Sequence, residues 1–242
     1  MNAIETRGLT KRYGALTAVN GLELSVREGE LFALLGVNGA GKTTTIKMLS
    51  CLTRPSEGDA LLLGKSVSRE PEEVKKLLAV SPQETAVAPK LSVAENLELM
   101  AGISGADRAE TKRRIDALCA QFGLAEVLKR PAGKLSGGWQ RRLSIAMALI
   151  LEPKILFLDE PTLGLDVLAR SALWDVIRSL KERMTIILTT HYMEEAEALS
   201  DRIGVMGAGQ LLRVGTAEEL KAATGADTLE NAFIALAKEA TR

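Results

Sequence analysis

A glycine-rich segment that contains one lysine, GVNGAGKTT at residues 36–44, lies between two regular patterns. The apolar run 31–35 precedes it, and apolar residues at helical spacing follow it from Ile46. Glycines let successive backbone N–H groups and a helix N-terminus point at one anion. The pattern is typical of a loop that binds nucleotide phosphates. The alternative, a glycine-rich turn with a chance lysine, is disfavoured by the strand before it and the helix after it.

Three side chains of this loop have separate predicted tasks. Lys42 adds positive charge near the β- and γ-phosphates, the Thr43 hydroxyl binds Mg²⁺, and Thr44 reaches the α-phosphate. The full predicted set for the phosphates is Gly36, Asn38, Gly39, Ala40, Gly41, Lys42, Thr43 and Thr44.

An acidic pair follows the apolar run 155–158, where polar residues at the end of a buried parallel strand meet ligands. We expect Asp159 to hold Mg²⁺ through water, and Glu160 to orient an attacking water or accept its proton. The alternative is that the two acidic residues only begin a loop, but a chain that already has a phosphate loop makes this weaker.

A second glycine motif, LSGGWQRR at 135–142, leads directly into an apolar helix. Ser136 is a good N-cap, yet Gly137 and Gly138 each cost up to about 1 kcal/mol relative to alanine near a helix start. A second anion that approaches this helix N-terminus would explain them. The alternative is an ordinary helix start softened by glycine.

The elements that position these motifs follow from the apolar pattern. Continuous runs at 31–35, 155–158 and 186–190 indicate buried parallel strands, and residues 22–26 alternate as a half-buried strand does. Apolar residues at helical spacing predict a helix over 167–182. This alternation predicts an α/β fold with a parallel sheet and right-handed crossovers.

The middle of the chain has a different pattern, which predicts a helical insertion in the α/β core. Ser92 with Glu95, and Asp107 with Glu110, are two helix-start signals. The last part of the chain indicates strands near 202–206 and 210–214, followed by two short amphipathic helices over 216–239.

Composition limits the partners. The chain has 242 residues, 46% hydrophobic and 26% charged, which suits one α/β core with an inserted subdomain. Its 31 basic residues balance 31 acidic ones, and no basic stripe with interleaved aromatics occurs, so we expect no nucleic-acid partner. Cys51 and Cys119 suit a reducing cytoplasm. The longest apolar run, 143–151, is less than half a membrane span, so a separate chain would cross any membrane.

The order of GVNGAGKTT, Gln83, LSGGWQ, ILFLDE, Leu165-Asp166 and His191 resembles the nucleotide-binding subunit of ABC transporters. The resemblance covers nearly the whole chain. It implies a P-loop NTPase fold with an ABC-type ATPase core, an inserted helical subdomain and an antiparallel β part near the N-terminus. In that family the LSGG segment of one subunit completes the ATP site of another, so it also implies a head-to-tail dimer with a second copy or a paralogue.

The resemblance implies roles for further residues. Tyr13 stacks on adenine, Gln83 reaches Mg²⁺ and the attacking water at the junction with the membrane subunit, and Asp166 belongs to a loop that crosses the dimer interface. His191, the chain's one histidine, contacts the γ-phosphate. The plainer alternatives are a surface strand residue for Tyr13, a polar loop residue for Gln83 and an incidental histidine for His191. For Asp166 the plainer alternative is the N-cap of the helix over 167–182, and this residue can have both roles.

These assignments combine into one predicted site. The catalytic residues are Glu160, His191, Lys42 and Gln83; the Mg²⁺ ligands are Thr43, Gln83 and Asp159; and Ser136, Gly137 and Gly138 bind nucleotide in trans. Trp139 departs from the family, which more often has glutamine or methionine there, and this puts its contact with the neighbouring subunit in doubt. The acidic residues Glu194, Glu195 and Glu197 are expected to form the solvated face of a helix.

The resemblance also implies a division of one ATPase domain, 1–242. The α/β core comprises 1–84 and 152–215, the helical subdomain comprises 85–151, and short C-terminal helices occupy 216–242.

Two functions compete. The first is the ATPase motor of an exporter, at the cytoplasmic face of the membrane on a polytopic permease, because APKLSVAENL and THYMEEAEALSDRI resemble the branch that serves drug, ion or polysaccharide efflux. In this reading two subunits close around two Mg-ATP molecules. The second is a soluble ABC ATPase, such as one for cluster assembly. A GTP-dependent switch is disfavoured, because no NKxD-type motif is present.

Overall fold

A mixed sheet forms the centre of the computed structural model, which describes residues 1–181 and 183–239. Within this part of the chain the sheet has six strands, in the order β11-β10-β4-β9-β8-β7. Neighbours pair in parallel from β10 to β7, and only β11 is antiparallel. The predicted parallel sheet is therefore confirmed. Its strands are β4 (Leu31–Leu35), β7 (Leu78–Ser81), β8 (Ile155–Asp159), β9 (Thr185–Thr190), β10 (Arg202–Gly207) and β11 (Gln210–Gly215).

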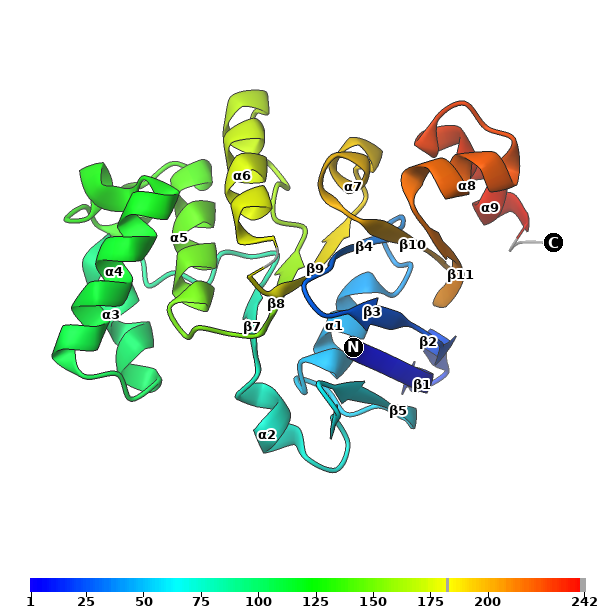
Figure 1. The fold of residues 1–242 in the computed structure, drawn as a ribbon, viewed down its shortest axis with the longest axis horizontal. Coiled ribbons are helices and arrows are strands. Elements are labelled where there is room, and N and C mark those ends of the chain that lie inside the picture. Colours follow the sequence, from blue (N-terminus) through cyan, green and yellow to red (C-terminus); the bar gives the residue numbers. More distant parts are fainter. Residues whose placement is uncertain (182, 240–242) are drawn as a thin grey trace.

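Every residue of β4, β8 and β9 is buried, which is the reason that these three strands read as continuous apolar runs. Helices cover both faces of the sheet (Figure 1). Helices of the core are α1 (Lys42–Leu49), α2 (Pro71–Lys75), α6 (Val167–Leu180) and α7 (Met193–Leu199). The predicted helix over 167–182 thus ends at Leu180, and position 182 lies outside the described residues.

A second, antiparallel sheet is built by the N-terminal part of the chain, as the resemblance implied. Its strands are β1 (Asn2–Tyr13), β2 (Leu16–Leu22), β3 (Ser25–Arg27), β5 (Glu57–Leu62) and β6 (Lys65–Ser66).

The single half-buried strand predicted over 22–26 is wrong. Leu22 ends β2, and β3 begins at Ser25. The buried Thr6 hydroxyl causes the break, because it donates to the Leu22 carbonyl at 2.7 Å and accepts from the Leu24 N–H at 2.7 Å. These bonds take the place of strand pairing at the bend. The alternating apolar side chains are still buried, because both strands face the same core.

Three helices beyond β7 form the green part of Figure 1: α3 (Val93–Ile103), α4 (Arg108–Phe122) and α5 (Gly137–Leu149). Short 3-10 turns at Leu124–Val127 and Ala132–Lys134 connect α4 to α5. The two helix-start signals are confirmed: Ser92 and Glu95 form a capping box, and the Asp107 carboxylate accepts from the Glu110 N–H at 2.9 Å.

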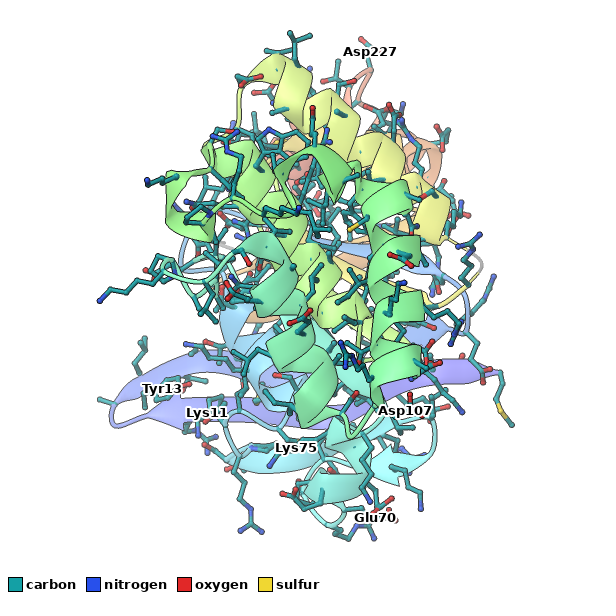
Figure 2. The ribbon with its side chains drawn as sticks, turned by 90° about the vertical axis from the view of Figure 1, so that its left-hand side faces the viewer. Lys11, Tyr13, Glu70, Lys75, Asp107 and Asp227 are labelled. Carbon is teal, nitrogen blue, oxygen red and sulfur yellow. The ribbon has the colours of Figure 1, made fainter. Side chains whose placement is uncertain are left out.

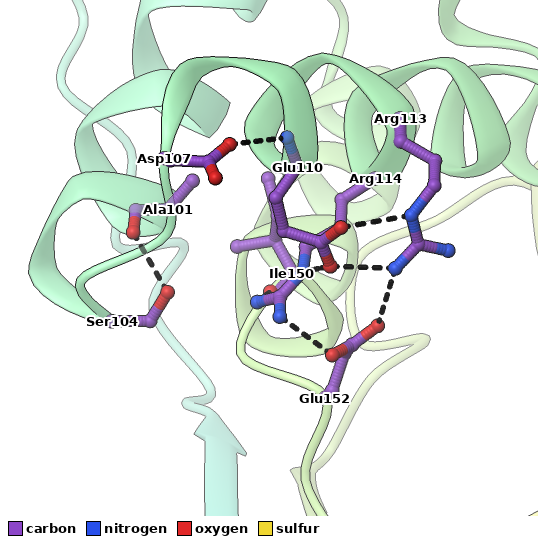
Figure 3. A network of polar contacts seen from close by, with 8 residues as sticks. All are labelled: Ala101, Ser104, Asp107, Glu110, Arg113, Arg114, Ile150 and Glu152. Carbon is purple, nitrogen blue, oxygen red and sulfur yellow. Dashed lines mark hydrogen bonds and ion pairs between the residues drawn. The ribbon is translucent and has the colours of Figure 1, made fainter.

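An ion-pair network ties α4 to the segment between α5 and β8 (Figure 3). The Glu110 carboxylate accepts from Arg113 and Arg114, and these hydrogen bonds lower the pKa of Glu110 to about 2. Arg114 also donates to the Ile150 carbonyl at 2.9 Å and pairs with Glu152 at 2.6 Å. The helical part is therefore fastened to the core where the chain enters β8.

The two C-terminal helices expected over 216–239 are α8 (Ala217–Thr224) and α9 (Leu229–Glu239). Leu220 and Phe233 pack with Leu35 and Val205 in one apolar cluster, which joins this pair to β4 and β10. Across the described residues, no helix is long and apolar enough to cross a membrane. The division of the chain at 85, 152 and 216 stays a prediction.

Candidate functional site

The glycine-rich loop connects β4 to α1, and its glycines are required for two different reasons. Gly39 and Gly41 have φ values of 82° and 101°, where other residues are strained. At Gly36 the constraint is space, because a Cβ there would lie 2.7 Å from the Met206 carbonyl oxygen. The Gly36 N–H in turn donates to the Thr190 carbonyl at 3.2 Å. The loop is thereby fixed against β9 and β10.

Lys42 folds back over the loop and is only 5% exposed. Its Nζ donates to the carbonyls of Gly36 at 2.7 Å and Val37 at 3.3 Å, and lies 3.4 Å from Glu160 Oε1. The groups around this buried ammonium are those that bind phosphate in other proteins: backbone N–H groups, a helix N-terminus and glycines with positive φ. The residues present therefore fit the phosphates of a nucleoside triphosphate.

Two threonines hold Asp159 at the end of β8. Thr189 Oγ1 donates to Asp159 Oδ1 at 2.5 Å, and Thr43 Oγ1 donates to the same oxygen at 3.2 Å. Both bonds go to Oδ1, so Oδ2 accepts no hydrogen bond from the described residues. A hydroxyl and a carboxylate side by side are oxygen ligands of the kind that Mg²⁺ prefers. The pair therefore fits the predicted metal position, with Thr189 as a support that the motif analysis missed.

Glu160 and His191 meet at the same sheet edge. Glu160 has φ 46°, an uncommon backbone conformation for this residue type, and is held by its N–H, which donates to both Thr189 oxygens at 3.1 Å. His191 Nδ1 lies 3.3 Å from Glu160 Oε2 yet is buried without a hydrogen bond. At the ends of β8 and β9, Asp159 lies opposite Thr189. This register brings the side chains of Glu160 and His191 together at the same edge. Backbone strain and an unsatisfied ring nitrogen both occur where the proposed chemistry lies.

The LSGG segment stands apart from this cluster. Ser136 is at the N-cap of α5, but its side chain makes no capping bond, and Ser136 and Gly137 are exposed. A Cβ on Gly138 would lie 3.3 Å from the Ala169 Cβ. No hydrogen bond or ion pair among residues 1–181 and 183–239 joins this segment to the phosphate loop.

Three more predicted site residues, and Trp139, belong to other elements of the fold. Tyr13 ends β1 with its ring 46% exposed and Lys11 Nζ 5.1 Å from the ring centroid, and both residues are labelled in Figure 2. The Gln83 side chain is exposed in the loop after β7. Asp166 caps α6, because its carboxylate accepts from the Ala169 N–H at 2.9 Å. Trp139 packs against the core of the helical part, with the Arg142 guanidinium 5.0 Å from the ring centroid.

The expectation for the acidic run after His191 is wrong at one position. Glu195 is completely buried rather than solvated, and the Trp174 indole N–H donates to its Oε1 at 3.1 Å. Burial raises the pKa of this carboxyl, and the hydrogen bonds and the charge of Arg170 only partly oppose the effect. Helical spacing is a usable signal, because Glu195 lies one turn before the buried Leu199 and beside the buried Ala196.

A parallel sheet edge that carries a phosphate loop, an acidic pair and a histidine, in a chain that also has an exposed LSGG segment at the start of α5, defines an ABC-type ATPase. Residues 19–163 match the ABC transporter sequence family. The chain is 42% identical over 228 residues to the daunorubicin/doxorubicin resistance ATP-binding protein DrrA of Streptomyces peucetius, which covers 94% of this chain and 69% of the relative.

Solved structures of ABC ATP-binding subunits are similar to this chain over most of its length. An ATP-binding subunit of an ABC transporter is similar with a TM-score of 0.86 and 31% identity, over 97% of this chain and 99% of that one. An ATP-binding cassette, solved as a dimer with ADP and inorganic phosphate, has a TM-score of 0.79 and 25% identity, over 88% of this chain and 98% of that one. The chain belongs to the ABC transporter family, as its ATP-binding subunit, and its hydrolysis of ATP drives transport.

Proposed function

We propose that this chain drives the export of drug-like compounds through a separate polytopic permease, at the cytoplasmic face of the membrane. The observation that carries the ATPase chemistry is the convergence of Lys42, Asp159, Glu160 and His191 at one edge of the sheet. The direction of transport is supported by the resistance function that the name of the Streptomyces relative states. The transported compound itself is selected by chains other than this one.

In the proposed mechanism this chain contributes positioning and charge rather than covalent chemistry. Lys42 would exchange its carbonyl partners for phosphate oxygens, and Thr43 and Asp159 would hold Mg²⁺. When bound, Mg²⁺ supplies positive charge to the triphosphate oxygens. Glu160 then aligns a water and accepts its proton at a carboxylate oxygen, while His191 contacts the γ-phosphate.

We further propose that a second copy or a paralogue completes each site. Ser136, Gly137 and Gly138 supply an uncapped, exposed helix N-terminus, which suits an anion held by another chain. The dimeric state of the solved cassette with ADP and phosphate supports this arrangement. Trp139 takes part in it only indirectly, because it packs against its own helical part.

A groove next to the Gln83 loop is the proposed contact for the permease. It has a volume of about 340 Å³ and lies among β7, α3, α5 and the end of α1. Its lining is mainly apolar and includes Pro82, Met100 and Met147, and Leu52 at its rim is 68% exposed. An apolar groove of this kind suits a short helix of a membrane subunit. Its position beside Gln83 suits the predicted role of that residue at the junction.

The Glu160→Gln substitution tests the motor. We expect turnover of ATP to fall to background while ATP binding persists, with ATP-dependent dimers that live longer than those of the wild type. Glu230→Gln, an exposed carboxylate on α9, is the matched control and keeps wild-type turnover. Single-turnover hydrolysis and size-exclusion chromatography with ATP provide the two measurements. Unchanged turnover in Glu160→Gln would contradict the catalytic assignment.

Affinity purification from membranes tests the partner. Co-purification with a polytopic membrane protein is expected, and its loss on Met100→Glu would identify the groove. Capture of a soluble scaffold instead would favour the cluster-assembly alternative over transport.

A further inference from the structure

Arg141 is a buried cation in the second turn of α5, directly after the LSGG segment. Only 4% of the residue is exposed, although a guanidinium is among the groups that are least often buried. No ion pair to a carboxylate is formed by it within the described residues. Its place in the interior therefore requires another explanation than a salt bridge.

The guanidinium is satisfied by main-chain carbonyls of two loops. Nη1 donates to the Pro82 carbonyl at 2.6 Å, and Nη2 donates to the Gln83 carbonyl at 2.5 Å and to the Glu160 carbonyl at 3.4 Å. One planar group thus joins three segments that lie far apart in the sequence. These are the helix that begins at LSGG, the loop that carries Gln83 and the turn that carries Glu160.

A second contact one turn further along α5 reinforces the first. Ser144 Oγ and Ser81 Oγ lie 3.1 Å apart, and both residues are buried. Arg141 and Ser144 therefore hold the end of β7 and the first loop residues at helical spacing. The Gln83 carbonyl is held by Arg141 while the residue stays exposed, so the backbone of the loop is tied to α5 and the side chain is accessible to a ligand.

An apolar side chain would fill this space at a lower desolvation free energy. Burying a guanidinium costs desolvation free energy, and burial lowers the pKa of Arg141, an effect that the nearby Asp159 and Glu195 charges oppose. A planar fork of donors, unlike an apolar group, specifies the positions of several oxygens at once. The arrangement is therefore more specific than packing requires.

We propose that Arg141 is a positioning residue, which couples the LSGG helix to the Gln83 loop and to the turn of Glu160. A displacement of α5 is transmitted to both loops through the three carbonyls. This inference rests on the proposed function, because it takes Gln83 and Glu160 as the groups that act on Mg²⁺ and water. Arg141 makes no hydrogen bond or ion pair with residues 36–44 within the described residues, so it affects turnover rather than nucleotide affinity.

The test compares Arg141→Met with Arg142→Met. Methionine keeps an unbranched, buried side chain but removes all the N–H donors. We expect kcat to fall about 10- to 100-fold, because misplacement of catalytic groups by about 1 Å has this effect, while KM for ATP changes less than threefold. Hydrogen exchange over residues 78–88, which include the paired amides of β7 and the Ala88 N–H that donates to Asn96 Oδ1 at 2.8 Å, should accelerate. Arg141→Lys keeps the charge without the fork, and an intermediate kcat is expected.

Arg142 is the matched control, because it is the next residue and its guanidinium also donates to a main-chain carbonyl, that of Phe122 at 3.3 Å within the helical part. Arg142→Met should keep kcat within about twofold and leave exchange over 78–88 unchanged. The proposal is overturned if Arg141→Met retains kcat within threefold, or if both variants lose kcat and melting temperature together. Unchanged exchange over 78–88 would also overturn it.

If Arg141→Met does not fold, Arg141→Lys decides: lower kcat with an unchanged melting temperature supports the coupling, and wild-type kcat with wild-type exchange contradicts it. If the wild type and Arg142→Met hydrolyse no ATP, the proposed function has failed. The exchange of residues 78–88 in Arg141→Met still decides whether Arg141 holds the loop.

Discussion

Replacing Thr189 with valine tests how the metal-binding carboxylate is held. The Thr189 hydroxyl is completely buried, donates to Asp159 Oδ1 at 2.5 Å and accepts from the Glu160 N–H at 3.1 Å. Valine has nearly the same shape but no hydroxyl. The buried carboxylate then keeps only Thr43 as a hydrogen-bond donor, whereas the Glu160 N–H keeps the Thr189 carbonyl.

The magnitude follows from the charge on the acceptor. A hydrogen bond to a charged group contributes about 1.5–3 kcal/mol, and one between neutral groups contributes about 0.5–1.5 kcal/mol. Thr185→Val is the matched control, because Thr185 lies on the same strand, is buried, and accepts a neutral bond from the Gly29 N–H at 3.0 Å. We expect Thr189→Val to lower the free energy of unfolding by about 1 kcal/mol more than Thr185→Val.

Urea denaturation of the nucleotide-free chain at pH 7.5 measures both free energies of unfolding. A double-mutant cycle with Asp159→Asn isolates the bond, and the coupling between positions 159 and 189 should reach at least about 1 kcal/mol. Equal costs for the two threonine variants, or a coupling near zero, would refute the reasoning.

Two further predictions concern buried constraints. The pKa of Glu195 is raised above its ordinary 4.5, so its ionisation opposes folding only above that pH, and stability falls as pH rises through the folded-state pKa. Glu195→Gln should therefore match the wild-type melting temperature near pH 4 and exceed it at pH 8. A difference in melting temperature that does not depend on pH would contradict this. Gly41→Ala should lower stability by about 1–3 kcal/mol from its backbone conformation, plus a clash with the Ala18 carbonyl 2.6 Å away. Gly105→Ala, at φ 78° with open space around it, should show the first cost alone, and equal melting temperatures of the two variants would contradict the clash.

The motifs made much of the site predictable, because its residues act through local patterns. The loop 36–44 is contiguous, and Asp159 and His191 each follow an apolar run whose length marks a buried strand. Parallel strands end at one edge, so their successive residues meet there without further information. The helix starts at Ser92 and Asp107 were predictable for the same reason, since capping bonds span only three residues.

The missed features all depend on contacts between distant segments. The break within 22–26 comes from the Thr6 hydroxyl, which only sheet pairing brings to that bend. Glu195 looked solvated because two other glutamates surround it, and its burial depends on Trp174 from a different helix. Arg141 was one of two adjacent arginines with no local sign of which was buried.

By itself, the sequence determined the phosphate loop, the strands around it, the helical insertion and the family, because periodicity and short motifs are local properties of the chain. Only the tertiary structure decided that Thr189 supports Asp159, that Arg141 joins two loops and that Glu195 is buried. These are choices between polar residues of similar type, and they follow from which carbonyls, hydroxyls and aromatic rings folding brings within about 3 Å.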